Sequence, residues 1–279
     1  MKNIRKVLNY NTFFVIIKVG VIMRKIVNGL SITCSKKLNS FDNIIELYTE
    51  KPFNFNLQYV KKETINEYYD IIREKIGYNF KIKRVNQTHS TNITIIDEKN
   101  ISKTIDDTDG LITNLKGVAI GTSLADCLGI ILYDPVKEVI GNIHSGWKGT
   151  LGKIIVNGIN IMVDKFLCNP KDIIAYLTPS IRECSFEVDS DVKDKFEKEF
   201  GLRYITTGEI KDNKQKYFID TVSINKDLLI SLGLKESNIE IEDMCTMCNY
   251  DKYYSYRAFT NKLDKVNGRN ISIICMKED

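Results

Sequence analysis

The chain has 279 residues, 43% of them hydrophobic, and only four prolines, so it is long and apolar enough to bury a substantial core. Its 40 basic residues against 36 acidic ones give a formal net charge of +4. That charge is too small to indicate a nucleic-acid partner, and no basic block or aromatic stacking motif supports one. Seven unevenly spaced cysteines favour free thiols in a reducing compartment, so we expect a cytoplasmic protein.

Residues 1–23 are expected to be an N-terminal extension outside the fold, followed by a single domain over 24–279. Basic residues precede an apolar run at 12–17, which imitates a signal peptide, but Lys18 interrupts the pattern and no small-residue cleavage site follows. The run is also too short to span a bilayer, so no membrane association is expected. A start at Met23 would place the whole run upstream of the domain.

The remaining chain alternates between predicted helices and strands. Apolar residues at helical spacing predict an amphipathic helix over 64–77. Short apolar runs predict strands over 80–86, 92–96, 117–122, 128–133, 139–144, 173–177, 253–257 and 271–275. Further helices are predicted over 149–167, 190–200 and 220–232, the last beginning at a capping Asp220 or Thr221. Mixed order with adjacent hairpins favours an α+β fold over a regular βαβ array.

Two of these strands bring chemistry-bearing residues together. Asp134-Pro135 marks a turn between the runs 128–133 and 139–144, which predicts a hairpin-like pair. Cys127 opens the first strand and His144 closes the second, so both lie at the same end of an antiparallel pair. His89 lies just past the end of the predicted strand over 80–86.

His89 and His144 are the only two histidines in the chain, and each lies in a dense local motif. With Cys127 they make a Cys-His-His set that suits Zn²⁺ and leaves a fourth position for water, the pattern of catalytic rather than structural zinc. Zinc lowers the pKa of bound water to ~7. A metal-free alternative makes Cys127 the nucleophile and His144 its base. Multicopper chemistry is excluded, because several copper sites need more imidazoles than this chain has.

Three further features have both a functional and a structural interpretation. Gly146-Trp147-Lys148-Gly149-Thr150 opens a predicted helix, whose free N–H groups and Lys148 suit a phosphate, unless Thr150 simply caps a glycine-assisted start. Arg257 offers either a fixed positive charge for the same ligand or a structural ion pair. Cys245 and Cys248 form a CxxC that resembles half of a zinc ribbon or a redox pair. No second CxxC exists, so two half-buried thiols in a tight turn are the simpler interpretation.

At these motifs the chain strongly resembles the family labelled polyphenol oxidoreductase or laccase-domain proteins, also known as YfiH-type purine nucleoside phosphorylases and peptidoglycan editing factors. The matching segments run in unbroken order: Gln87-Thr88-His89, Asp109-Gly110-Leu111-Ile112-Thr113, Ala125-Asp126-Cys127-Leu128, His144-Ser145-Gly146-Trp147-Lys148-Gly149-Thr150, Cys184-Ser185-Phe186-Glu187-Val188, Cys245-Thr246-x-Cys248 and Tyr254-Ser255-Tyr256-Arg257 with Gly268-Arg269. The chain departs from the family where Lys148 replaces an arginine, Thr178 a glycine and Ser185 a cysteine.

The resemblance implies a single α+β domain of packed mixed sheets with outer helices. It implies a Zn²⁺ cofactor on His89, Cys127 and His144, with purine nucleosides and phosphate as substrates. The implied reactions are phosphorolysis of adenosine, inosine and 5'-methylthioadenosine, and deamination of adenosine. Two alternatives stay open: a metal-free Cys/His hydrolase or amidase linked to cell-wall quality control, and a catalytically weak binding protein. The sequence does not indicate an oligomeric state or a preferred nucleoside.

Overall fold

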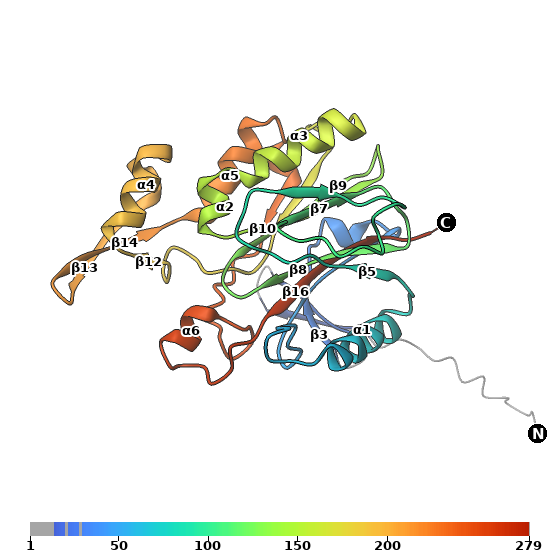
Figure 1. Cartoon of the computed structure of the whole chain (residues 1–279), viewed down its shortest axis with the longest axis horizontal. Coiled ribbons are helices and arrows are strands. Elements are labelled where there is room, and N and C mark those ends of the chain that lie inside the picture. The colour runs from blue at the N-terminus through green and yellow to red at the C-terminus, as the bar shows by residue number, and fades with distance from the viewer. Residues whose placement is uncertain (1–13, 20–21, 28–29, 279) are drawn as a thin grey trace, which may run out of the picture.

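The computed structural model describes residues 14–19, 22–27 and 30–278 (Figure 1). Its strands are β1 (Phe14–Val19), β2 (Ile22–Val27), β3 (Leu30–Thr33), β4 (Ile44–Thr49), β5 (Lys81–Lys83), β6 (Ile93–Ile95), β7 (Gly110–Thr113), β8 (Val118–Leu124), β9 (Leu128–Asp134), β10 (Val139–Ser145), β11 (Ile174–Leu177), β12 (Glu187–Val188), β13 (Ile205–Lys211), β14 (Lys214–Ile219), β15 (Ile239–Ile241) and β16 (Asn270–Met276). Its α-helices are α1 (Lys62–Ile76), α2 (Trp147–Leu151), α3 (Ile154–Phe166), α4 (Ser190–Phe200), α5 (Thr221–Ser231) and α6 (Tyr256–Thr260).

These strands form three sheets. Seven lie in the order β1-β2-β3-β4-β16-β8-β5, six in the order β15-β11-β9-β10-β7-β6, and three in the order β12-β14-β13. Most neighbours are antiparallel, but β5 pairs parallel with β8, β6 with β7 and β15 with β11. The predicted α+β fold with mixed sheets and flanking helices is therefore confirmed.

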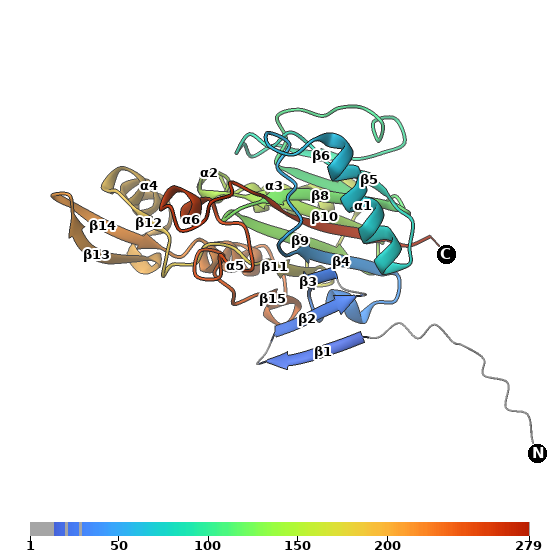
Figure 2. The ribbon, with the colours of Figure 1, turned by 90° about the horizontal axis from the view of Figure 1, so that it is seen from below.

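The two large sheets pack face to face, with helices on both outer sides. Successive side chains of a strand point to opposite faces of its sheet, so each strand can contact both neighbouring layers. Ile273 of β16 packs toward α1, and its neighbour Ile274 faces the six-stranded sheet. Helices α3 and α5 cover the far side of the six-stranded sheet through residues such as Ile159 and Leu229. The result is four layers, with α1 on one outer side and α3 and α5 on the other (Figures 1 and 2).

The predicted hairpin is present, with His144 opposite Gly129 and Ser145 opposite Leu128. The helix predicted over 149–167 is instead two helices, α2 and α3. The break falls at Gly152 and Lys153, where Lys153 adopts a φ of +56° and Gly152 lies so close to Thr91 that a Cβ would meet its methyl at 2.5 Å. The close contact with Thr91 requires a glycine at position 152, and glycine weakens the interior of a helix.

The strand predicted over 253–257 is wrong. The tyrosine-rich run leads into α6, which begins after Ser255, whose hydroxyl accepts a hydrogen bond from the N–H of Ala258. Thr150 does not cap α2, because the cap position falls on Gly146. The predicted cap at Asp220 is confirmed by a hydrogen bond from the N–H of Ser223 to the Asp220 side chain.

The expected N-terminal extension contains strand-forming residues. β1 pairs with β2, and β2 pairs with β3, so this hairpin extends one edge of the seven-stranded sheet (Figure 2). Residues 1–13 lie outside the described part of the chain. That the domain can fold without residues 1–22 stays a prediction.

A second unit projects from the layered body (Figure 1), and of its elements the sequence predicted only the helix over 190–200. It consists of α4 and the small sheet of β12, β14 and β13, and it packs through Phe196, Tyr204 and Ile219. Trp147 and Leu151 of α2 pack against the same cluster, so this unit lies beside the hairpin end that carries His144.

Candidate metal centre and active site

Cys127 is presented by a tight turn between β8 and β9. Asp126 in this turn has a φ of +81°, a region that residues other than glycine rarely adopt. Both carboxylate oxygens of Asp126 are held, by the Thr246 hydroxyl at 2.7 Å and by the N–H of Arg257 at 2.6 Å. These hydrogen bonds stabilise the strained turn and thereby fix the position of Cys127.

His144 is held by a single buried carboxylate. Its Nδ1 lies 2.7 Å from Oδ1 of Asp109, and both side chains are buried. An ionised carboxylate can only accept a hydrogen bond, so Nδ1 of His144 carries the proton. In the neutral ring Nε2 is then the nitrogen with the free electron pair. Asp109 therefore orients the ring and fixes its tautomer.

The same carboxylate positions His89. His89 has a φ of +61°, and the consecutive N–H groups of Thr88, His89 and Ser90 all donate to Asp109, at 3.2, 3.1 and 2.6 Å. The Ser90 hydroxyl adds a fourth hydrogen bond at 2.7 Å. Asp109 thus holds the backbone of one histidine and the side chain of the other.

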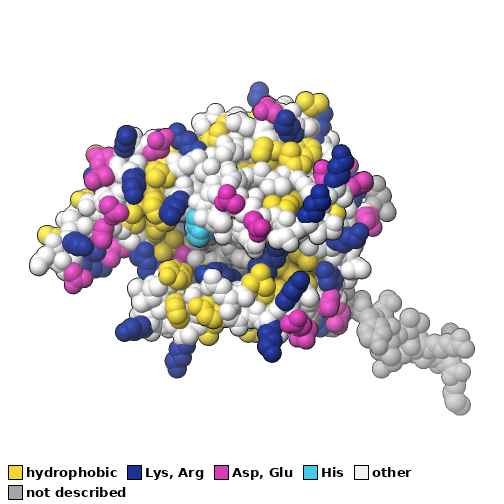
Figure 3. Space-filling model, in the orientation of Figure 1, with side chains coloured by type: hydrophobic (Ala, Val, Ile, Leu, Met, Phe, Trp, Pro, Cys, Tyr) yellow, Lys and Arg dark blue, Asp and Glu magenta, His cyan; other side chains and the backbone are white. Residues whose placement is uncertain are grey.

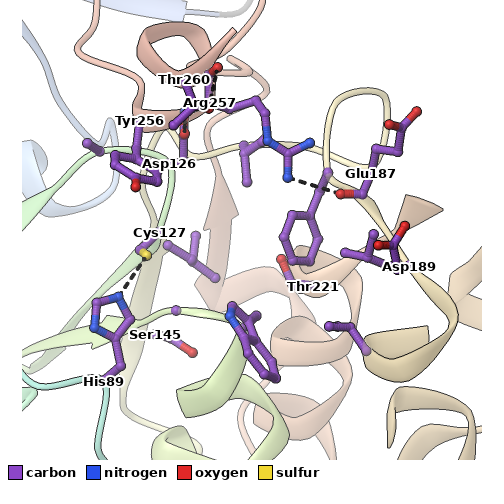
Figure 4. Close-up of a pocket in the computed structure, with 18 of the residues that line it drawn as sticks. His89, Asp126, Cys127, Ser145, Glu187, Asp189, Thr221, Tyr256, Arg257 and Thr260 are labelled. Carbon is purple, nitrogen blue, oxygen red and sulfur yellow. Dashed lines mark hydrogen bonds between the residues drawn. The ribbon is translucent and has the colours of Figure 1, made fainter. Parts of the chain in front are cut away.

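These elements bring His89, Cys127 and His144 together. One potential ligand atom from each lies within 4.8 Å of the others, and Cys127 Sγ is 3.8 Å from His89 Nε2 (Figure 4). The two imidazole rings meet edge to face, with centroids 4.8 Å apart. Gly146 allows this approach, because a Cβ there would lie 2.9 Å from His89 Cδ2 and 3.1 Å from Cys127 Sγ.

Charges within the cluster shift its pKa values strongly. Burial disfavours the Cys127 thiolate, but the charge on His144 and hydrogen bonds from both histidines outweigh it and lower its pKa to about 6. Burial likewise disfavours a charged His144, yet Cys127 and Asp109 raise its pKa to about 9. Burial also opposes ionisation of Asp109, but hydrogen bonds from His144 and Ser90 hold its pKa well below the usual range. Without a metal, a thiolate–imidazolium pair is therefore favoured.

The donor set fits a metal ion. A thiolate and two imidazoles are ligands that Zn²⁺ prefers, and a histidine that donates its second N–H to a carboxylate is typical of a metal-binding residue. The low pKa of Cys127 supplies the deprotonated sulfur that metal binding needs. A metal ion held by these three residues would take the place of the proton that His144 carries in the metal-free pair.

Two lobes of a cavity meet at the cluster, and both are bordered by His89, Ala125, Cys127 and Tyr256. The first, about 470 Å³, is here called the apolar lobe and is drawn in Figure 4. Its apolar lining consists of Leu128, Trp147, Ile181, Phe186, Val188 and Val192. The second, about 600 Å³, is called the arginine lobe and is lined by Asn56, Arg84, Asn86, Gln87, Asn267 and Arg269. Both volumes fall in the range of small-molecule sites. A histidine side chain is visible at the edge of the hollow beside the projecting unit (Figure 3).

The predicted phosphate-binding residues are only partly brought to this cavity. Gly146 and Arg257 line the apolar lobe, and Arg257 donates to the carbonyls of Ser185 and Glu187. Lys148 is exposed and lines neither lobe. Gly149 and Thr150 are buried behind α2, where the Thr150 hydroxyl is 3.0 Å from that of Ser145.

Other residues at the site were missed by the sequence reasoning. Asp109 was noted only within a family motif, and nothing in its spacing indicates that it holds both histidines. Arg84 has no motif, although it directly precedes the segment that leads to His89. Arg269 lies in the matched Gly268-Arg269 motif, which was the available signal for its place in the cavity.

Comparisons with known proteins agree with this architecture. The chain is 34% identical to a purine nucleoside phosphorylase of Borreliella burgdorferi over 77% of this chain and 87% of that one. It is 31% identical to adenosine deaminase RL5 from an unknown prokaryotic organism, over 61% of this chain and 67% of that one. The crystal structure of the hypothetical protein YfiH of Bacillus licheniformis shares the fold, with a TM-score of 0.78 and 24% identity over 90% of this chain and 98% of that one.

No helix in the described part of the chain is both long and apolar enough to cross a lipid bilayer. The family described as multi-copper polyphenol oxidoreductase laccase matches residues 49–277, which include the metal-ligand cluster and both lobes of the cavity. The protein therefore belongs to this family.

Proposed function

We propose that this chain is a Zn²⁺-dependent enzyme of purine nucleosides, which cleaves adenosine, inosine and 5'-methylthioadenosine with phosphate and deaminates adenosine. The observation that carries the proposal is the position of His89, Cys127 and His144 at the point where an apolar and a cationic lobe meet. The names of the relatives, purine nucleoside phosphorylase and adenosine deaminase, support the substrate class.

The apolar lobe suits a nucleobase. Trp147 and Phe186 offer flat aromatic surfaces, and Asp189 and Thr221 add polar groups at its wall. A purine ring gains from burial against aromatic faces, and its ring nitrogens and exocyclic group need a few polar partners. We assign the base to this lobe.

The arginine lobe suits phosphate better than the start of α2 does. Arg84 and Arg269 both line it, and neither forms an ion pair with a carboxylate in the described part of the chain. Arg84 donates to the Phe55 carbonyl and to the Ser123 hydroxyl, which fixes its direction without neutralising its charge. Arginine binds phosphate through two parallel hydrogen bonds. We therefore move the proposed phosphate role from Lys148 to Arg84 and Arg269.

A metal ion held by His89, Cys127 and His144 would supply an activated water at neutral pH, which suits attack on the amine-bearing carbon of a purine. Asp109 keeps Nδ1 of His144 protonated and so keeps Nε2 available. The walls of the apolar lobe exclude bulk water from the base. Arg84 and Arg269 hold the phosphate beside the sugar, so that the same centre serves both reactions.

A second candidate function rests on the Cys127–His144 pair. A thiolate stabilised at neutral pH beside an imidazolium is also the arrangement of a cysteine nucleophile with its acid–base partner. This candidate is a metal-free hydrolase or amidase. It predicts activity that survives chelation and is abolished by alkylation of Cys127.

The test measures metal content and turnover on purified protein. We expect about one zinc at this centre, and loss of that zinc and of turnover in each of His89→Ala, Cys127→Ala and His144→Ala. Adenosine should yield inosine, and added phosphate should release free base. Zinc retained at this centre by Cys127→Ala would remove Cys127 from the ligand set.

Two arginine variants separate the reactions. Arg269→Gln should depress phosphorolysis of inosine more than deamination of adenosine, because only the first needs phosphate. Lys148→Ala serves as the control and should leave the ratio unchanged. Equal loss of both activities in Arg269→Gln would contradict the phosphate assignment, and a zinc-loaded protein with no turnover of any purine nucleoside would leave the binding-protein alternative.

A further inference from the structure

Three cysteines outside the centre described above lie together at the surface, Cys184 and Cys248 exposed and Cys245 buried beneath them. Cys184 belongs to the loop between β11 and β12, and Cys245 and Cys248 belong to the loop after β15. A bridge between Ser180 and Cys245 holds the two loops side by side. The fold thus adds a third thiol to the CxxC, which the spacing of the sequence did not indicate.

The distances among these thiols suit a shared metal ion. All three sulfur atoms lie within 4.8 Å of one another, and those of Cys184 and Cys248 are 3.8 Å apart. Sulfur ligands at 2.3 Å from a tetrahedral Zn²⁺ lie about 3.8 Å from each other. A disulfide needs a sulfur–sulfur distance of about 2.05 Å, far shorter than the separation seen here.

The surroundings of the thiols favour a negatively charged complex. The N–H of Arg182 donates to Cys245 Sγ at 3.5 Å. Nε and Nη1 of the Arg182 guanidinium are buried and have no hydrogen-bond partner in the described part of the chain. A buried cation with unpaired donors is costly unless an anion lies nearby. The Glu242 carboxylate already interacts electrostatically with this guanidinium, and so does the Cys245 sulfur. Three thiolates around one divalent cation carry a net charge of −1, which would add to that compensation.

We propose that Cys184, Cys245 and Cys248 form a second site for a thiophilic divalent cation, with Zn²⁺ as the expected ion. The three thiols each release a proton on binding, and a water occupies the fourth position beside the Ser185 hydroxyl, which lies 3.3 Å from Cys248 Sγ. No electron transfer is involved. This site is independent of the proposed function.

A metal at this site would brace the active centre. The carbonyl of Ser185, next to Cys184, accepts a hydrogen bond from Arg257 at 3.2 Å. Thr246, between the two cysteines of the CxxC, holds Asp126 in the strained turn before Cys127. Fixing the two loops to one ion therefore stiffens both the wall of the apolar lobe and the turn that carries Cys127.

The experiment counts metal ions in the native protein and three variants, all purified under reducing conditions. We expect two zinc ions per native chain, one in Cys184→Ser/Cys248→Ser, and one in His89→Ala/Cys127→Ala. Cys168→Ala, which removes a buried thiol outside both clusters, should retain two. Co²⁺ added to metal-free His89→Ala/Cys127→Ala should give an intense thiolate-to-cobalt charge-transfer band in the near ultraviolet, and this measurement leaves the three cysteines intact.

The outcomes separate the two sites. No thiolate–cobalt band in the His89→Ala/Cys127→Ala protein, or an undiminished zinc content in Cys184→Ser/Cys248→Ser, would overturn the proposal. A Cys184–Cys248 disulfide in the reduced preparation would overturn it as well. A native content of one zinc that is lost only in His89→Ala/Cys127→Ala would leave the proposed function standing without the second site.

Discussion

The two cysteine-containing clusters of this protein are held in place by different means. His89, Cys127 and His144 are oriented by Asp109 and by two strained backbone positions, so the fold itself positions the ligands. The thiols of Cys184 and Cys248 lie exposed on loops, and their contacts are mainly to one another and to Ser185. The first cluster is therefore held in its geometry by the fold, whereas the second would gain its order from a bound ion.

Among changes that test this difference between the clusters, substitution of Asp109 is expected to have the largest effect on zinc affinity. Asp109→Ala removes the acceptor that orients His144 and the acceptor of three consecutive N–H groups around His89. Loss of such a supporting carboxylate costs about 10–100-fold in metal affinity or activity, and more is expected where it holds two ligands. Zinc affinity is measured by competition with a chromophoric chelator.

Asp107→Asn is the matched control for Asp109→Ala. Asp107 contacts the Thr88 hydroxyl and Asn92 but neither imidazole. We expect it to retain zinc at the native level. Equal zinc affinity in Asp109→Ala and the native protein would show that the fold positions the histidines without this carboxylate.

The pH dependence of alkylation distinguishes the two clusters directly. In metal-free protein the pKa of Cys127 is lowered to about 6, so its reactive thiolate predominates at pH 7 and disappears as pH falls through 6. Burial raises the pKa of Cys184, so its thiolate forms only in alkaline solution. Mass spectrometry of iodoacetamide-treated peptides across pH 5–10 should show Cys127 modified first. Simultaneous modification of both cysteines near pH 9 would contradict this order.

A smaller effect is expected from Gly146→Ala. The added Cβ would lie 2.9 Å from His89 Cδ2, so the imidazole must shift by several tenths of an ångström. Misplacement by ~1 Å can cost ~10²-fold in rate, so a loss on the order of tenfold is expected here. Gly149→Ala is the control, because its Cβ would meet only ordinary contacts starting at 3.4 Å. Turnover of adenosine measures both, and equal activities would argue against crowding at His89.

The smallest effect is expected from truncation. A chain that starts at Met23 loses β1 and the first residue of β2, and within the described residues β1 pairs with β2 alone, at the outer edge of the seven-stranded sheet. Both cysteine-containing clusters lie away from that edge, so we expect the same zinc content and the same turnover as in the full chain. Insoluble protein, or loss of zinc on truncation, would show that the edge strands support the sheet that carries the sites.

The sequence predicted the Cys127–His144 part of the first cluster because that geometry is local, and it added His89 because the chain has only two histidines. Cys127 and His144 lie at adjoining ends of one hairpin, and hairpin pairing follows from apolar runs around a turn. Cys184 and Asp109 could not be placed in this way, since their partners lie on other loops. The break at Gly152 and Lys153 depends on a tertiary contact with Thr91, which no helical periodicity reveals.

The family description mentions several copper ions, whereas the chain has two histidines in all. Centres with several copper ions require many imidazole ligands, so the number of histidines in the sequence already argues against multicopper chemistry. The strand expected over 253–257 failed for a different reason. Aromatic residues favour strands, but a cap at Ser255 was enough to start α6 instead.

Trp147 gives the cavity an optical reporter of its own. It is the single tryptophan of the chain, it lines the apolar lobe, and Lys148 and Lys195 lie over its ring at 5.7 and 5.6 Å. Its emission is therefore a signal from one place only, and a base stacked near the indole should quench it. Fluorescence titration of a variant without turnover can then rank nucleosides by occupancy, separately from any catalytic assay.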